Sequence, residues 1–344
     1  MFETTVSEVG LVVAVNRHTV DVLVSDGAVL ACRLHGRFRS EALRGAGVVV
    51  GDRGILGPPP PVPAPGVVPH LRTLLRIEPR TSVLRRQLTA RAEARVGEDR
   101  TVAANVDLCL VVQAYRDPAF RPAVADRLIA IARASSIPVA LVLNKAEDAP
   151  ETDVEVHLGP YRRLGIDGYA VSALTGLGLP RLEDRCAGAL AVMLGPSGVG
   201  KSALTAALAA GEGPATGAVS DARRRRGRGR HTTVQSRVFP LRRGGFLIDT
   251  AGIRSLALAE GATPVDAFPE IEQLALACRF PDCAHRSEPG CAVRAALAAG
   301  QLPARAYEGY LRVSADHAAR PTGPGSAGPR GGRRRTSRAD QEDL

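Results

Sequence analysis

The sequence predicts a multidomain protein: a small N-terminal β-barrel, a central α/β domain and a mainly helical C-terminal domain. Closely spaced β-rich runs fill residues 6–57, and strands and helices alternate from about residue 100. A Cys/His cluster stands in a helical region after residue 258. A length of 344 residues suits two or three domains of ordinary size.

In the first region, turn residues such as Asp26 and Gly27 separate the β-rich runs, a pattern typical of a small barrel. Seven prolines between residues 58 and 69 then predict an extended insert. The expected strands are residues 9–15, 20–25, 29–34, 48–56 and 74–77.

The central region predicts a mostly parallel sheet covered by helices on both faces, because apolar strands alternate with helices. From residue 320 the Gly/Pro/Arg-rich tail has too little apolar surface to order itself. The expected strands are residues 107–114, 137–143, 169–172, 189–194, 236–241 and 246–249, and the expected helices are residues 121–135, 154–164, 179–187 and 201–210.

A phosphate-binding loop is predicted where the motif G-x-x-x-x-G-K-[ST] follows an apolar strand and opens a helix. Backbone N–H groups of such a loop surround phosphate oxygens, its lysine reaches the β- and γ-phosphates, and its hydroxyl binds Mg²⁺. The strand, the lysine and the serine together argue against a glycine-rich turn that only caps a helix. The residues are Gly195, Pro196, Ser197, Gly198, Val199, Gly200, Lys201, Ser202 and the following Ala203.

Two signals upstream of this loop resemble base-recognition motifs. Asn144, Lys145 and Glu147 follow an expected strand and resemble N-K-x-D, whose carboxylate accepts two hydrogen bonds from the guanine edge. Adenine lacks that pair of donors, and Glu147 is one methylene longer than the usual Asp. Lys145 is one of only two lysines in a chain that otherwise uses arginine, which argues against a plain turn. Ser172 and Ala173 follow the next strand and resemble the start of the S-A-K signal.

The order of the motifs indicates a circular permutation. Residues 249–252 fit D-x-x-G at a strand end, which predicts Asp249 in the Mg²⁺ shell and the Gly252 amide near the γ-phosphate. In ordinary small GTPases the phosphate loop and D-x-x-G precede the base motifs, whereas here they follow them. A parallel sheet can be cut and rejoined when its ends lie close together. The segment after D-x-x-G then leads directly into the C-terminal domain, so a nucleotide-sensitive switch would act on a separate module.

Four metal-ligating residues lie within 14 positions of the C-terminal region, with the spacing C-x₄-C-x-H-x₅-C. Three thiolates and one imidazole satisfy tetrahedral zinc and leave no open position for water, so the site is expected to be structural. Buried structural cysteines are the alternative, which the dense spacing and the histidine disfavour. The residues are Cys278, Cys283, His285 and Cys291.

Composition favours a cytoplasmic protein, and its charge fits a polyanionic partner and a solubilising surface equally well. The net charge of +10 suits nucleic acid, nucleotides or an anionic membrane surface, although a solubilising surface would also be basic. Cys32, Cys109 and Cys186 are isolated, which is not the pattern of a secreted disulfide framework. The N-terminus resembles no signal peptide, and no stretch reaches the roughly 18 apolar residues of a membrane span.

Taken together, the motifs resemble the RsgA family of circularly permuted, ribosome small-subunit-dependent GTPases. The resemblance covers about residues 5–315 and departs at Glu147, at Ala251 and in the Pro-rich insert. It rests on residues 103–107, 144–145, 171–173, 195–202, 229–233, 249–252 and 278–293.

The resemblance implies an OB-fold barrel, a permuted P-loop GTPase domain and a zinc-binding domain. It assigns GTP or GDP with Mg²⁺ to Lys201, Ser202 and Asp249, and one structural Zn²⁺ to the Cys/His cluster. It implies binding to the small (30S) ribosomal subunit and its 16S rRNA during late maturation, and GTP hydrolysis stimulated by that subunit. A monomer without membrane contact is expected. The expected boundaries are 1–96 for the barrel, 97–258 for the GTPase domain, 259–318 for the zinc domain and 319–344 for a disordered tail.

The intrinsic hydrolysis rate is expected to be low, because Ras-like enzymes orient water with a Gln where this chain has Ile253. His231 stands beside Thr232 and Thr233 in the presumed switch, and it could position water or bond the backbone or RNA. One of the two threonines is expected to close over Mg²⁺.

Six arginines between residues 223 and 230 precede the switch. Such a loop is solvated when free, and on RNA it could order on phosphates and set the switch. Replacing these arginines is predicted to abolish subunit-stimulated hydrolysis while sparing basal turnover. Stimulation that stays unchanged would contradict this hypothesis.

Two other functions fit the same residues. One is an RNA-binding scaffold with a nucleotide-stabilised fold and negligible turnover, which a turnover assay with and without subunits separates from an enzyme. The other is an ATPase acting on nucleic acid, which a competition of GTP against ATP decides.

Overall fold

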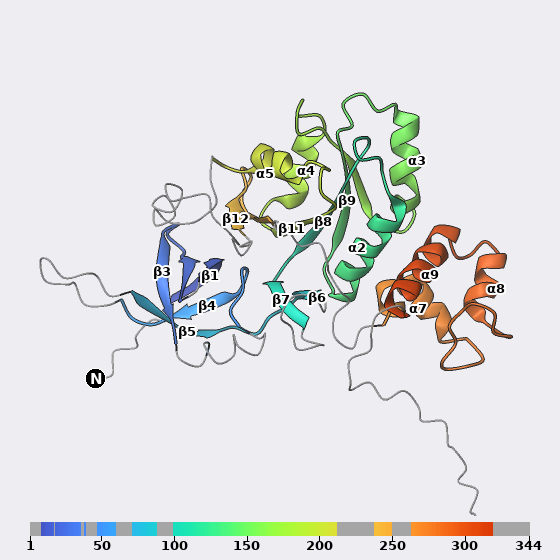
Figure 1. Ribbon diagram of the computed structural model, residues 1–344, viewed down its shortest axis with the longest axis horizontal. Helices are drawn as coiled ribbons and strands as arrows, with labels where there is room; N and C mark the ends of the chain where they lie inside the picture. Colours follow the sequence, from blue (N-terminus) through green and yellow to red (C-terminus); the bar gives the residue numbers. More distant parts are fainter. Residues whose placement is uncertain are drawn as a thin grey trace, which may run out of the picture.

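The computed structural model describes residues 8–16, 18–35, 38, 47–59, 71–87, 99–211, 237–249 and 263–318. Figure 1 shows a small β-structure, a central sheet flanked by helices, and a helical C-terminal part beside α2. Most of the Pro-rich insert, the arginine loop, the switch threonines and the tail lie outside the described residues.

The N-terminal strands form a closed barrel in the order β1-β2-β3-β5-β4, which confirms the predicted barrel. β3 and β5 pair in parallel, and the other pairs are antiparallel. Alternating valines such as Val20 and Val22 fill the interior together with Phe38. The strands are β1 (Glu8–Val15), β2 (Thr19–Leu23), β3 (Val29–Leu34), β4 (Arg53–Leu56) and β5 (Arg72–Ile77).

The single strand predicted at residues 48–56 is wrong, because a turn interrupts it. Gly51 has a φ of +88°, and the buried carboxylate of Asp52 accepts a hydrogen bond from the Val49 N–H at 2.8 Å. Arg80 donates to the same carboxylate through two nitrogens, at 2.7 and 2.9 Å. β4 therefore begins only at Arg53.

An antiparallel pair that the sequence analysis did not predict, β6 (Val83–Gln87) and β7 (Asp99–Ala104), follows the barrel. The apolar residues of these strands are grouped at one end of each strand and do not alternate with polar residues, so the sequence gives no period-2 signal. Asn105 then joins the barrel to the central sheet: its side chain donates to the Gly51 carbonyl at 2.9 Å and accepts from the Thr81 N–H at 2.8 Å.

The central sheet has the strand order β10-β9-β8-β11-β13-β12. All neighbouring strands are parallel except β12, which is antiparallel to β13. Every residue of β8 is buried, as expected for a strand covered on both faces. The strands are β8 (Leu108–Ala114), β9 (Val139–Asn144), β10 (Asp167–Ala170), β11 (Leu190–Leu194), β12 (Arg237–Pro240) and β13 (Phe246–Asp249).

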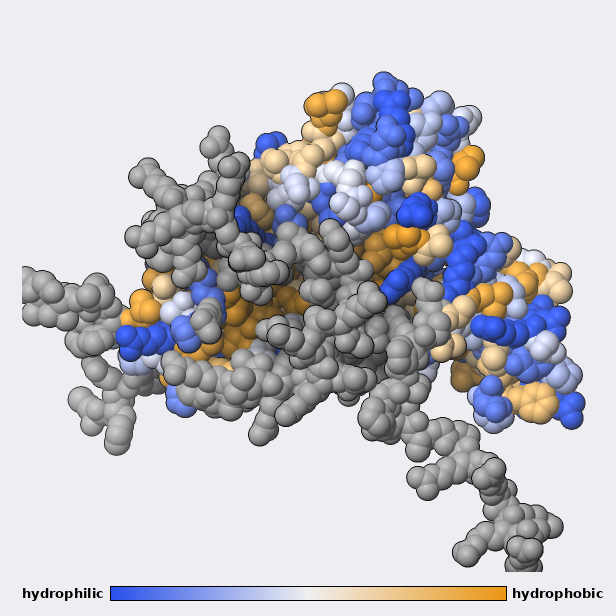
Figure 2. All heavy atoms as spheres, in the orientation of Figure 1, coloured by the Kyte–Doolittle hydropathy of each residue, from blue (hydrophilic) through white to orange (hydrophobic). Residues whose placement is uncertain are grey.

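Helices cover both faces of this sheet, which confirms the predicted α/β architecture. Buried residues of α2 (Pro122–Ala134) and α3 (Glu151–Arg162) share one apolar cluster, and those of α4 (Leu179–Cys186) and α5 (Lys201–Leu208) share another. The outer surface of α3 is mainly hydrophilic in Figure 2, in keeping with its few buried residues. α3 begins three residues earlier than expected, with acidic residues in its first turn.

The C-terminal part comprises η2 (Val265–Ala267), α7 (Pro269–Ala275), α8 (Ala292–Ala298) and α9 (Ala304–Ala318). The apolar cluster on the α2 side of the sheet continues into it through Phe268 and Val313. A buried carboxylate, Asp126 on α2, accepts hydrogen bonds from Arg305 and Arg312 of α9 at 2.5 and 2.6 Å. No helix among the described residues is long and apolar enough to cross a bilayer.

Candidate nucleotide and metal sites

The predicted phosphate loop lies between β11 and α5, where its glycines fit positions that a side chain would disturb. A Cβ atom on Gly195 would lie 2.3 Å from the Val112 carbonyl oxygen. Gly198 and Gly200 have φ values of +85° and +93°, in the left-handed region that favours glycine. The loop therefore turns sharply and presents the N-terminus of α5 at the sheet edge, the arrangement that suits a phosphate.

Lys201 and Asp249 bring opposite charges to this loop. The Lys201 ammonium donates to the carbonyl oxygens of Gly195 and Pro196 at 2.8 and 2.7 Å. Burial lowers the pKa of Lys201, and the negative charge of Asp249 opposes that shift. Burial likewise raises the pKa of Asp249, opposed by Lys201 and Arg237. An anionic phosphate near Lys201 and a cation near Asp249 would favour the charged form of each.

Asn144, at the end of β9, connects three predicted motifs. Its side-chain amide donates to the Val199 carbonyl in the phosphate loop at 2.9 Å. Its side-chain oxygen accepts from the Ala173 N–H at 3.1 Å. Since Asn144 is only 2% exposed, both bonds are protected from water. A Cβ atom on Gly200 would lie 2.3 Å from the Asn144 amide nitrogen, so this contact also requires glycine.

The other base-motif residues surround Asn144. Lys145 has a φ of +60°, and its ammonium donates to the Asp117 carbonyl. One carboxylate oxygen of Glu147, Oε2, is buried and has no hydrogen-bond partner among the described residues. Ser172 is fully buried, and its hydroxyl accepts from the N–H groups of residues 174 and 175 at 3.2 and 3.1 Å. Ser172 thus shapes the turn that presents the Ala173 N–H, and β10 ends at Ala170, earlier than predicted.

The structure brings the upstream and downstream motifs to one edge of the sheet. Asn144 ends β9, Gly195 follows β11, and Asp249 ends β13, and these strands run parallel within the sheet. In open α/β sheets, ligands bind outside the carboxyl ends of the strands. The remaining predicted residues, His231, Thr232, Thr233 and Gly252, lie outside the described residues and stay predictions.

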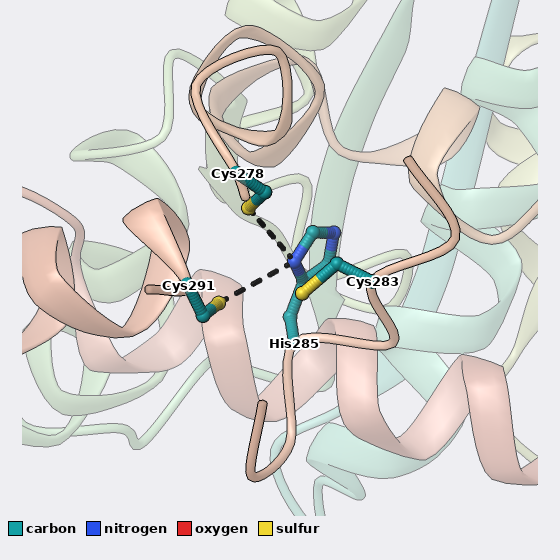
Figure 3. A group of neighbouring side chains, drawn as sticks. All are labelled: Cys278, Cys283, His285 and Cys291. Carbon is teal, nitrogen blue, oxygen red and sulfur yellow. Dashed lines mark hydrogen bonds between the residues drawn. The ribbon is translucent and has the colours of Figure 1, made fainter. Parts of the chain in front are cut away.

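The four predicted metal ligands converge in the C-terminal part, where their ligand atoms all lie within 4.8 Å of one another. Figure 3 shows the three sulfur atoms around the His285 ring, whose Nδ1 lies 3.6 Å from Sγ of both Cys278 and Cys291. Cys291 caps α8 and accepts from the Arg294 N–H at 3.5 Å. Three thiols and one imidazole in this arrangement fit a tetrahedral zinc ion.

Local electrostatics differ among the four residues: burial raises the pKa of the Cys283 thiol to about 11, whereas the pKa values of Cys278 and His285 shift toward the forms that bind metal. Burial would raise the pKa of Cys278, but backbone hydrogen bonds at Val293 and Ala292 and side-chain hydrogen bonds with the neighbouring cysteines together outweigh it and lower that pKa. Burial lowers the pKa of His285, which favours the neutral imidazole. Backbone N–H groups, including that of Arg286 at 2.8 Å, hold the pKa of Glu288 at about 2 and fix the turn after His285.

Comparison with known proteins decides the family. The RsgA GTPase family model matches residues 77–259, more than half of the chain. This chain belongs to the RsgA GTPase family. The small ribosomal subunit biogenesis GTPase RsgA of Gemmatimonas aurantiaca is 37% identical over 314 residues, covering 90% of this chain and 97% of that protein. The protein of the same name from Moorella thermoacetica is 38% identical over 298 residues, covering 86% of this chain and 93% of that protein.

Solved structures show the same fold. The crystal structure of YjeQ from Thermotoga maritima matches with a TM-score of 0.67 and 24% identity, covering 92% of this chain and all of that chain. The crystal structure of YloQ, a circularly permuted GTPase, matches with a TM-score of 0.66 and 22% identity, covering 94% of this chain and 99% of that chain. Membership of the RsgA family confirms the predicted family and makes this chain a GTP-hydrolysing enzyme.

Sequence reasoning missed the loop after β8, which lies beside the site of this RsgA family member. Asp117 accepts from Lys145, Arg116 faces Glu147 and Asp148, and Pro118 lies near the phosphate loop. The sequence held a signal for this loop, because the polar residues Arg116 and Asp117 follow a buried parallel strand that ends at the same edge of the sheet.

Proposed function

We propose that this protein is a GTPase of small ribosomal subunit biogenesis that binds the 30S subunit and its 16S rRNA and acts as a late maturation checkpoint. The observation that carries the proposal is the position of Asn144, which bonds the phosphate loop and the Ser172-Ala173 turn at the sheet edge where Asp249 ends β13. This arrangement supports one composite site for base and phosphates in a chain whose RsgA relatives are named for that process.

Within this site, the residues 195–203 would hold the phosphates, with Lys201 on the β- and γ-phosphates and Ser202 and Asp249 around Mg²⁺. Asn144, Lys145, Glu147, Ser172 and Ala173 would hold the guanine. The bound cation would supply charge stabilisation for phosphoryl transfer. His231 and one of the switch threonines would complete the site around the attacking water.

The C-terminal cluster would hold one structural zinc ion through Cys278, Cys283, His285 and Cys291. We further propose the domain limits 1–96, 97–258 and 259–318, a cytoplasmic location, and a monomer without membrane contact. The basic charge of the whole chain supports a polyanionic partner such as ribosomal RNA.

The test is GTP turnover by the purified protein, alone and with small ribosomal subunits, using ATP as the control nucleotide. Strong stimulation with GTP only is the expected result. Equal use of ATP would contradict guanine recognition, and absence of stimulation would favour an RNA-binding scaffold with negligible turnover.

A further inference from the structure

Arg116 lies in the loop after β8 and belongs to no nucleotide motif, but hydrogen bonds of its two neighbours set its backbone position. On one side, the Tyr115 N–H donates to the Asn144 carbonyl at 2.8 Å, and the Tyr115 hydroxyl donates to Asp153 at 2.6 Å. On the other side, the Asp117 carbonyl accepts from Lys145. Both neighbours of Arg116 are therefore hydrogen-bonded to the base motif or to α3. These bonds hold the backbone of Arg116 in place, although its side chain is half exposed.

Arg116 faces two adjacent carboxylates that could both compete for a guanine. Its guanidinium hydrogen-bonds Asp148 Oδ2 at 2.5 Å and lies 4.0 Å from Glu147 Oε1. The Asp148 side chain is 67% exposed and the Glu147 side chain only 20%. The arginine thus engages Asp148 directly and stands beside one oxygen of Glu147.

The second oxygen of Glu147 is left without a partner. Glu147 Oε2 is buried, and within the part of the chain that the structure describes nothing donates to it. A buried carboxylate oxygen is normally hydrogen-bonded, so an orphaned one at a binding edge points to a donor on a ligand. The guanine N1–H and N2–H₂ groups are donors of that kind.

We propose that Arg116 is a positioning residue that makes Glu147, and not Asp148, the carboxylate that recognises guanine. The proposal rests on the function proposed above. A glutamate has one more rotatable bond than the usual aspartate, so it loses more rotamer freedom when it binds. A nearby guanidinium restricts that freedom and offsets repulsion between the two neighbouring acids. Arg116 would compensate in this way for the longer side chain.

The test is equilibrium binding of GDP, IDP and ADP to the full chain. IDP keeps the N1–H donor and lacks the 2-amino group, so the GDP-to-IDP affinity ratio reports how well the carboxylate meets both donors. We expect Glu147→Gln to weaken GDP binding by about 100-fold or more, because a recognition site loses its paired acceptor. We expect Asp148→Asn to stay within about twofold, since its exposed ion pair contributes little.

For Arg116→Ala we expect GDP binding to weaken by about 5- to 20-fold, with a smaller loss for IDP, so that the ratio falls. Arg116→Lys should recover part of the lost GDP affinity. In the Glu147→Gln background, Arg116→Ala should cause no further loss of affinity. The matched control is Arg162→Ala, a similarly exposed arginine bonded to a single carboxylate, Glu155, at 2.8 Å. A general folding defect would lower both affinities alike and leave the ratio unchanged.

The proposal is overturned if Arg116→Ala leaves the GDP-to-IDP ratio at the value of Arg162→Ala, or if Asp148→Asn causes the loss in place of Glu147→Gln. A separate outcome concerns the proposed function: if the unmodified protein binds ADP as well as GDP, guanine recognition itself fails before Arg116 is at issue.

Discussion

At the scale of single residues, the proposed nucleotide site depends on a few side chains that bond to backbone. Asn144 bonds two loops at once, and Lys201 bonds the loop that carries it. Backbone groups have fixed positions, so each such bond sets a loop conformation before any ligand arrives. The site is therefore largely preorganised, which lowers the entropy lost on binding.

Asn144→Ala is predicted to weaken nucleotide binding and to destabilise the fold. The change leaves the Val199 carbonyl and the Ala173 N–H without their partner, and an unsatisfied buried polar group costs about 1–3 kcal/mol. We expect GDP affinity to fall by about 10- to 100-fold. Titration calorimetry with GDP, together with a thermal melt, measures both effects. An unchanged affinity would show that the two loops hold their conformation without Asn144.

Lys201→Ala is predicted to weaken GTP binding more than GDP binding, because the ammonium is expected on both the β- and γ-phosphates. In the free protein this ammonium uses two backbone carbonyls, which a phosphate would replace. Competition binding of the two nucleotides checks the difference. Arg185→Ala, which removes a surface ion pair with Asp167, is the control and should leave both affinities unchanged.

At the scale of elements, the C-terminal helix α9 is docked on α2 by a buried charge cluster. Asp126 is 6% exposed and accepts hydrogen bonds from Tyr161 of α3 at 2.9 Å as well as from Arg305 and Arg312. The Arg305 guanidinium also lies 5.0 Å from the centre of the Tyr161 ring. One carboxylate therefore fixes α9 against two helices of the GTPase part.

Asp126→Asn is predicted to loosen this docking with little change in shape. Removing one partner of a buried ion pair costs about 3–5 kcal/mol, and we expect about 2–4 kcal/mol because Arg312 is 39% exposed. Hydrogen exchange of residues 304–318 should rise and thermal stability should fall. Glu308→Gln, which removes only an exposed pair with Arg312, should change neither. Equal exchange in both variants would contradict the role of Asp126.

How far the sequence predicts these elements depends on whether the signal is local. The barrel strands, the phosphate loop and the metal cluster each have a periodicity or a spacing within a short window, and they form as expected. The β6–β7 pair has no such pattern. Asp126 meets Arg305 and Arg312, which follow it by 179 and 186 residues, and no local rule links partners so far apart.

At the scale of the whole molecule, the metal cluster is connected to the nucleotide-binding part through α9. The Tyr307 hydroxyl donates to the His285 carbonyl at 2.7 Å, and the Tyr310 hydroxyl donates to the Ala284 carbonyl at 3.3 Å. The same helix carries Arg305, which bonds Asp126. The barrel interior has its own apolar core, while Val13 and Val50 of the barrel region belong to the larger cluster that reaches the C-terminal part.

Zinc removal is therefore predicted to destabilise α9 as well as the segment that contains the four metal ligands. A chelator, or Cys283→Ser, should raise hydrogen exchange first around residues 278–298 and then in α9, because the metal site holds the turn on which α9 packs. Exchange in the barrel strands should not change. Metal analysis should find one zinc per chain in the untreated protein. Unchanged exchange in α9 after zinc loss would show that the helix docks independently of the metal.

The placement of the tyrosines gives the protein an intrinsic optical signal. The chain has no tryptophan and five tyrosines, of which Tyr161, Tyr307 and Tyr310 contact the Asp126 cluster or the metal-binding turn. Tyr115 lies beside the nucleotide site, and only Tyr169 stands apart on β10. Without tryptophan to mask it, ultraviolet emission comes from these rings, so movement of the C-terminal domain should be visible in solution without any attached dye.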